Sequence, residues 1–112
     1  MATNFIQEGN VLTFTAPSGG VTSGQGVLIG DTFGIVLADA DEGDECEVGT
    51  VGVYTIDKAT DAMIEGEKLW WDDSAKNVTT TSASNTLAGV CVTLGGAASG
   101  DTEVDIRLNG SF

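Results

Sequence analysis

The chain has 112 residues, of which 17 are Asp or Glu and only 4 are Lys or Arg, so its formal net charge is -13. So acidic a surface repels phosphate backbones, which argues against nucleic acid as a partner. Apolar residues make up 41% of the chain and lie in strand-length runs, so the acidity does not indicate disorder, and we expect one folded domain over residues 1–112.

The first ten residues, MATNFIQEGN, contain neither the basic region nor the apolar stretch of a secretory signal. No apolar run in the chain approaches the length of a membrane span. We therefore expect no membrane partner and no secretion by the usual route.

Short apolar runs that end at Gly, Asp or Ser follow one another along the first half of the chain, which is typical of β-strands separated by turns. The predicted strands here cover residues 11–16, 26–30, 31–39 and 45–56. The last of them contains Gly49 and Gly52, and glycine inside a strand often marks a bulge or a close backbone approach. We expect this strand to bend sharply around a small barrel.

The segment KATDAMIEGEK is the one candidate for helical structure. Thr60 can cap a helix, residues 61–65 can form a turn or so, and Gly66 suits the left-handed position that ends it. So short a helix needs tertiary support, and we predict one short helical turn here.

The segment GEKLWWDDSAKN contains both tryptophans of the chain beside two aspartates. Trp70 and Trp71 point to opposite faces of an extended strand, so their rings cannot form one stacking platform. Turn-forming residues follow, and NVTTT is a returning strand. We predict a β-hairpin with one tryptophan in the core and the other exposed or at an interface. A carbohydrate-binding module that uses Trp70 or Trp71 is the alternative.

Two more strands are predicted, over residues 86–94 and 102–108. The final strand alternates, with Val104, Ile106 and Leu108 on one face, as a half-buried strand does. The segment LAGVCVTL is apolar on both faces, which predicts a strand that is central in the fold or covered by another subunit. Together these patterns predict an all-β chain, a small barrel or sandwich of short antiparallel strands.

The chain has no histidine, which excludes a Ser-His-Asp triad, a Cys-His pair and a histidine general base. Cys46 and Cys91 cannot close a tetrahedral zinc site, and their surroundings predict reduced, structural thiols. The acidic run DADEGDE fits a solvated loop and departs from the calcium-loop spacing. No Gly-Lys dipeptide is present, so the Walker pattern is absent. We expect no enzymatic activity, no metal site and no cofactor.

Four motifs belong to a pattern that covers nearly the whole chain: NFIQ, VTSGQGVLIG, the run from Gly66 to Asp72 before a Thr-rich strand, and the ending RLNG. This pattern resembles the small acidic capsid cement, or decoration, proteins of tailed bacteriophages. Members of that family are sometimes labelled recombinase-like, and the missing phosphate-binding motif argues against that label here.

The resemblance implies a structural virion protein, made in the cytoplasm of the bacterial host, that binds the outer capsid surface. There it would stabilise contacts between major capsid protein subunits, with no catalytic residues. Related decoration proteins commonly act as trimers, so a homotrimer is expected. As contacts with the capsid or between copies we predict Phe5, Ile6, Trp70 and Phe112, since terminal apolar residues gain most from a neighbouring subunit.

Overall fold

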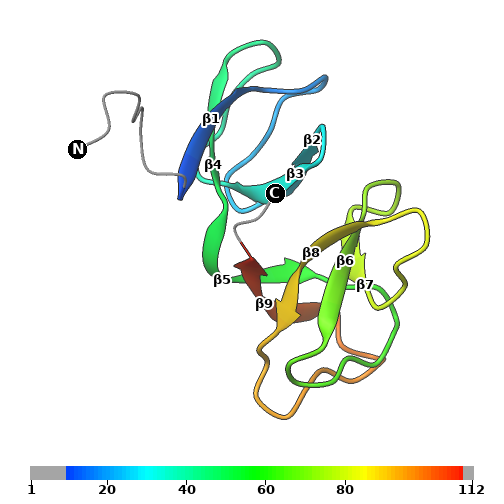
Figure 1. Cartoon of the computed structure of the whole chain (residues 1–112). Helices are drawn as coiled ribbons and strands as arrows, with labels where there is room; N and C mark the ends of the chain where they lie inside the picture. Colours follow the sequence, from blue (N-terminus) through cyan, green and yellow to red (C-terminus); the bar gives the residue numbers. More distant parts are fainter. Residues whose placement is uncertain (1–9, 110–112) are drawn as a thin grey trace.

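The computed structural model describes residues 10–109, which form nine strands in two antiparallel sheets (Figure 1). The first sheet has the order β1-β4-β3-β2 and consists of β1 (Val11–Thr15), β2 (Gly26–Ile29), β3 (Thr32–Val36) and β4 (Glu45–Gly49). The second has the order β5-β9-β8-β6-β7 and consists of β5 (Val51–Asp57), β6 (Lys68–Asp72), β7 (Asn77–Thr79), β8 (Thr86–Cys91) and β9 (Glu103–Asn109). The predicted all-β class of short antiparallel strands is confirmed.

The chain leaves the first sheet at the end of β4 and enters the second with β5 (Figure 1). The predicted bend within residues 45–56 is present, but two strands in different sheets replace the single predicted strand. Gly52 has a φ of 111°, in the left-handed region that favours glycine. A Cβ at Gly49 would lie 2.6 Å from the hydroxyl oxygen of Tyr54. Glycine at these two positions therefore allows the chain to turn from one sheet into the other.

The five-stranded sheet curls until its two edges approach each other. Just beyond β5, Lys58 forms a parallel bridge with Val78 of β7, and the Ala59 N–H donates to the Val78 carbonyl at 2.8 Å. The result is a partly closed half-barrel, in agreement with the predicted small barrel.

Buried side chains form two clusters, and β3 contributes to both. The larger cluster fills the curled sheet and includes Trp71 together with Phe33 and Ile35 of β3. The smaller one includes Val36 of β3 and Cys46 of β4. Side chains alternate along a strand, so β3 packs on both of its faces and connects the two sheets.

The predicted helical turn over residues 61–65 is wrong, and residues 10–109 contain no helix. Met63 instead pairs with Ala97 in an antiparallel bridge whose two hydrogen bonds are each 2.8 Å long. Gly66 does have a positive φ, of 86°, but within a tight turn. The backbone hydrogen bonds between Met63 and Ala97, which is distant in the sequence, outweigh the weak helical preference of so short a stretch.

The strand predicted to be central is central, because β8 lies between β9 and β6. Its pairing with β6 shifts register, so that Leu69 lies opposite Gly89 and Trp70 lies opposite Leu87. Ala88 is the extra residue of this bulge, which bends the strand as the sheet curls. No described residue belongs to a helix that could cross a membrane.

Candidate contact surface

The hairpin of β6 and β7 separates the two tryptophans, as predicted. Trp71 is 2% exposed and belongs to the core of the half-barrel. Trp70 is half-buried on the opposite face of the same strand. One tryptophan is therefore structural, and the other remains accessible to a partner.

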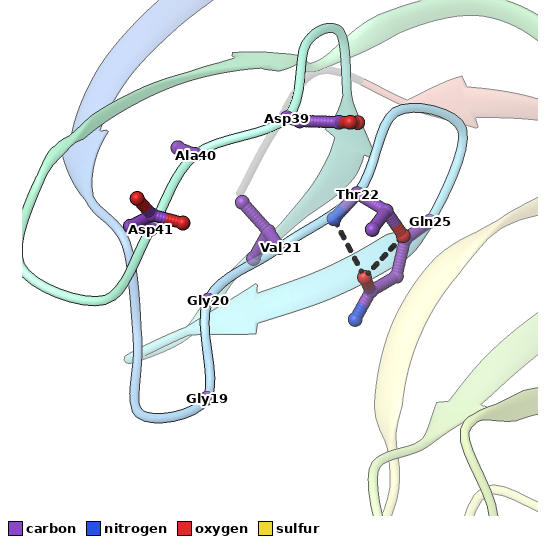
Figure 2. Close-up of a pocket in the computed structure, with 8 residues that line it drawn as sticks. All are labelled: Gly19, Gly20, Val21, Thr22, Gln25, Asp39, Ala40 and Asp41. Carbon is purple, nitrogen blue, oxygen red and sulfur yellow. Dashed lines mark hydrogen bonds between the residues drawn. The ribbon is translucent and has the colours of Figure 1, made fainter.

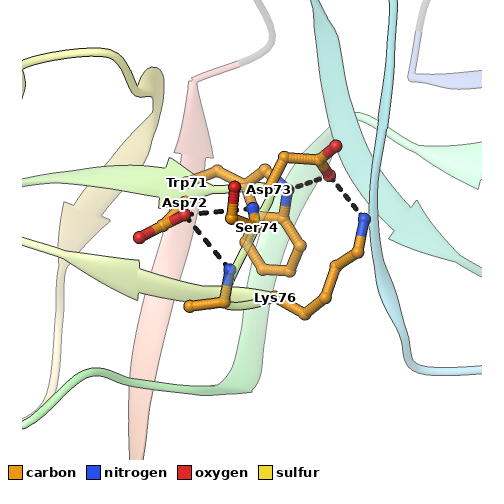
Figure 3. Close-up of polar contacts among 6 residues, drawn as sticks. Trp71, Asp72, Asp73, Ser74 and Lys76 are labelled. Atoms are coloured by element: carbon orange, nitrogen blue, oxygen red, sulfur yellow. Dashed lines mark hydrogen bonds and ion pairs between the residues drawn. The ribbon is translucent and has the colours of Figure 1, made fainter.

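The turn after β6 is held by its own aspartates (Figure 3). The Trp71 Nε1–H donates to Asp73 Oδ1 at 3.0 Å, and Lys76 Nζ lies 2.8 Å from the same oxygen. These donors, Lys76 first, hold the pKa of Asp73 below its usual value by stabilising the carboxylate. Asp72 Oδ1 accepts a bond from the backbone N–H of Ser74 at 3.0 Å. Both carboxylates thus serve the hairpin.

This geometry corrects part of the carbohydrate alternative. Trp71 has no open ring face for stacking on a sugar, and its Nε1–H is already bonded to Asp73. Of the two tryptophans, Trp70 alone has exposed surface that a sugar could reach.

Several other carboxylates tie neighbouring loops to the body of the protein. They accept bonds from backbone N–H groups: Asp39 from Ser23 (2.7 Å), Glu42 from Gly19 (3.0 Å), Glu65 from Gly95 (3.2 Å) and Asp101 from Ala98 (3.0 Å). Among residues 10–109, no three or more Cys, Asp or Glu side chains gather where they could hold a metal ion.

A hollow of about 440 Å³ lies beside the acidic loop (Figure 2). It is lined by Gly19, Gly20, Val21, Thr22, Gln25, Asp39, Ala40 and Asp41. The carboxylates of Asp39 and Asp41 do not point toward one another, and Gln25 Oε1 accepts bonds from the N–H and hydroxyl of Thr22 at 3.0 and 3.1 Å. No pair of reactive groups converges in this hollow.

Lys58 is a buried cation with a structural role. Lys58 is only 6% exposed. Its Nζ donates hydrogen bonds to the carbonyls of Ala59 (2.9 Å), Ala98 (2.9 Å) and Asp101 (3.3 Å). These bonds join the end of β5 to the loop that precedes β9.

Asp61 is a second polar anchor. It accepts hydrogen bonds from the Thr79 hydroxyl and, at 3.0 and 3.1 Å, from the N–H and hydroxyl of Thr80. These bonds, with a smaller contribution from the charge of Lys58, hold the pKa of Asp61 below its usual value, although burial opposes them. Asp61 therefore ties the segment after β5 to β7.

The outer face of the five-stranded sheet carries apolar, cationic and acidic side chains, the last being Asp57, Glu103 and Asp105. Its register pairs Lys68 with Val90, Val90 with Arg107, and Arg107 with Val53. Cross-strand partners point to the same side of a sheet, so these four residues form a row across β6, β8, β9 and β5. We call Lys68, Val90, Arg107 and Val53 the cationic row; Val53 is 62% exposed.

Of the four predicted contact residues, only Trp70 falls within the described residues. It lies on the outer face two residues along β6 from Lys68, and opposite Leu87. Phe5, Ile6 and Phe112 lie outside the described residues.

The sequence-based prediction missed the three most exposed large apolar residues of the described part of the chain. Val53, Ile64 and Leu94 are 62, 70 and 90% exposed. Val53 could have been found from the alternation along its strand, because it faces away from the buried Ile56. Ile64 lies two residues before Gly66, and Leu94 directly precedes Gly95. Both glycines have a positive φ, and such turns are the sequence feature that could have predicted exposure of these two side chains.

The two antiparallel sheets, with loops held by side-chain hydrogen bonds, define an all-β protein. The chain belongs to the phage cement protein family, which it matches over residues 6–108. No curated protein and no solved structure matches the chain. The family predicted from the sequence is confirmed, and with it a structural role in the virion, in association with the phage capsid. The family is one of structural proteins.

Proposed function

We propose that the protein binds the outer surface of the assembled phage capsid and stabilises contacts between neighbouring major capsid protein subunits. The observation that carries this proposal is the match to phage cement proteins over residues 6–108. The chain would be made in the cytoplasm of the bacterial host and join the shell there.

The described structure supports this role physically. A cement protein needs firm surfaces more than a reactive pocket, and here carboxylates such as Asp61 and Asp73 bind the protein's own loops. A net charge of -13 favours solubility before docking. Many weak contacts that symmetry repeats over a shell add up to strong attachment.

We further propose that the protein acts as a homotrimer, as related decoration proteins commonly do. Phe5, Ile6, Trp70 and Phe112 are the proposed contacts with the capsid or between copies. For Trp70, the half-buried position beside Leu87 on the outer face supports this role.

Co-sedimentation with shells that lack the protein tests the proposal. Purified protein should bind mature shells until it reaches a fixed ratio to the major capsid protein. An unrelated β-protein of similar size and acidity is the matched control, since it measures non-specific attachment. A wild-type protein that remains in the supernatant with mature shells would reject the proposal.

A further inference from the structure

The cationic row contains two basic side chains that are not neutralised within residues 10–109. Of the four basic residues, Lys58 is bonded to three carbonyls and Lys76 is paired with Asp73. The side chains of Lys68 and Arg107 are exposed and make no hydrogen bond or ion pair with another described residue. They lie on either side of Val90.

Asp105 is the carboxylate nearest in sequence to Arg107 on this face. It is half-buried, and its Oδ1 accepts a bond from the Thr55 hydroxyl at 2.8 Å. The hydroxyl is neutral, so Asp105 keeps its negative charge, but it forms no ion pair with Arg107. The charge of Arg107 remains available to a partner.

The four-stranded sheet presents a face of the opposite sign. Glu45 and Glu47 are exposed on the same side of β4, and Glu47 Oε1 accepts a bond from the Thr13 hydroxyl at 3.0 Å. Leu37, which is 40% exposed, lies beside them, because its N–H donates to the Glu47 carbonyl at 2.9 Å. We call Leu37, Glu45 and Glu47 the acidic face. No Lys or Arg occurs in any of the four strands of this sheet.

We infer that the cationic row receives the acidic face of a second copy of this chain in a head-to-tail contact. In the row, Val53 and Val90 lie beside the two basic side chains. In the acidic face, Leu37 lies beside two glutamates. Docking would bury these apolar side chains against one another and pair unlike charges. Two cationic rows placed against each other would oppose like charges at Lys68 and Arg107.

The spacing of the charges fits this contact. Residues two apart on one strand, such as Glu45 and Glu47, are separated by about 7 Å, and residues two strands apart, such as Lys68 and Arg107, by about 10 Å. The Lys and Arg side chains are long enough to bridge the difference between these two spacings. In a head-to-tail contact every copy offers its cationic row to one neighbour and its acidic face to another. A ring closes when the rotation between neighbouring copies divides a full turn into equal steps.

This inference refines the homo-oligomer of the proposed function and does not depend on capsid binding. Sedimentation of the full chain tests it. The wild type should form an oligomer, and the double variant Lys68→Glu/Arg107→Glu should raise the dissociation constant about tenfold or more, since charges at an interface become repulsive. Lys76→Glu, which reverses another exposed cation, is the matched control and should leave association unchanged.

Adding Glu45→Lys and Glu47→Lys to the same double variant restores opposite charges between copies and should restore the oligomer. Circular dichroism checks that each variant is folded. A monomeric wild type would overturn the inference, as would an oligomer that the double variant does not weaken. The variant that carries all four substitutions would also overturn the inference if it stayed dissociated. That result is expected if the oligomer instead forms by contact between two identical faces. If the double variant lost shell binding but kept an unchanged oligomer, the cationic row would be assigned to capsid contact, which contradicts the inference.

Discussion

The rings of Trp71 and Phe33 pack with their centroids 4.9 Å apart and their planes tilted by 38°. Trp71 comes from β6 in the five-stranded sheet, and Phe33 comes from β3 in the four-stranded sheet. The pair therefore connects the two sheets through one core, and the sheets should lose their structure together.

Trp71→Ala should lower the free energy of unfolding by about 3–5 kcal/mol, because it removes a large buried side chain and leaves a cavity. The adjacent Trp70→Ala is the matched control and should cost less, since Trp70 is only half-buried. Urea denaturation followed by far-ultraviolet circular dichroism measures both. Equal losses for the two variants would contradict the assignment of Trp71 to the core.

Gly89→Ala should destabilise the five-stranded sheet by about 2 kcal/mol or more, the range for overpacking that the backbone must absorb. The new Cβ would lie 2.1 Å from the carbonyl oxygen of Arg107, in the neighbouring strand. Gly100→Ala adds the same methyl group where nothing lies within 4 Å. Thermal unfolding should show a lowered midpoint for the first variant and little change for the second. Similar midpoints for the two variants would contradict the close approach of β8 to the backbone of β9 at residue 89.

Lys58→Met should lower the free energy of unfolding by about 2–4 kcal/mol, because three carbonyls lose a charged donor in a buried place. The loop of residues 98–101 should also exchange its amide hydrogens faster. Lys76→Met removes an exposed ion pair and should cost about 0.5 kcal/mol or less. If Lys58→Met were as mild as this control, the structural role assigned to Lys58 would be refuted.

Asp61→Asn should destabilise the protein at neutral pH by about 1–2 kcal/mol, because the hydrogen bonds to an ionised acceptor weaken. The pKa of Asp61 is lowered in the folded state, chiefly by the bonds from Thr79 and Thr80. Its contribution is therefore present above the unfolded pKa of about 4, and is lost as the pH falls through the folded pKa.

Denaturation of the wild type and Asp61→Asn across this pH range should give stability curves that converge in acid. Asp41→Asn, at an exposed position in the acidic loop, removes none of the hydrogen bonds that Asp61 accepts and should destabilise the protein less than Asp61→Asn at neutral pH. A difference between Asp61→Asn and the wild type that stays constant below about pH 4 would contradict the ionic role of Asp61.

Local patterns in the sequence predicted most strands to within a few residues. The alternation of Val104, Ile106 and Leu108 was confirmed, and so was the separation of Trp70 from Trp71. These features follow from the two-residue period of a strand, which the sequence shows directly.

Features set by distant residues could not be predicted in this way. The bridge between Met63 and Ala97 replaced the expected helical turn, and it joins segments more than thirty residues apart. The cationic row likewise depends on the register of four strands, which no local pattern specifies.

The thermal disruption of capsids tests the central claim most directly. Mature shells that lack the protein should disrupt at a higher temperature once the purified protein has bound them at its saturating ratio, and the increase should disappear when bound protein is removed. Shells that bind the protein fully and yet disrupt at an unchanged temperature would contradict the proposed stabilising function.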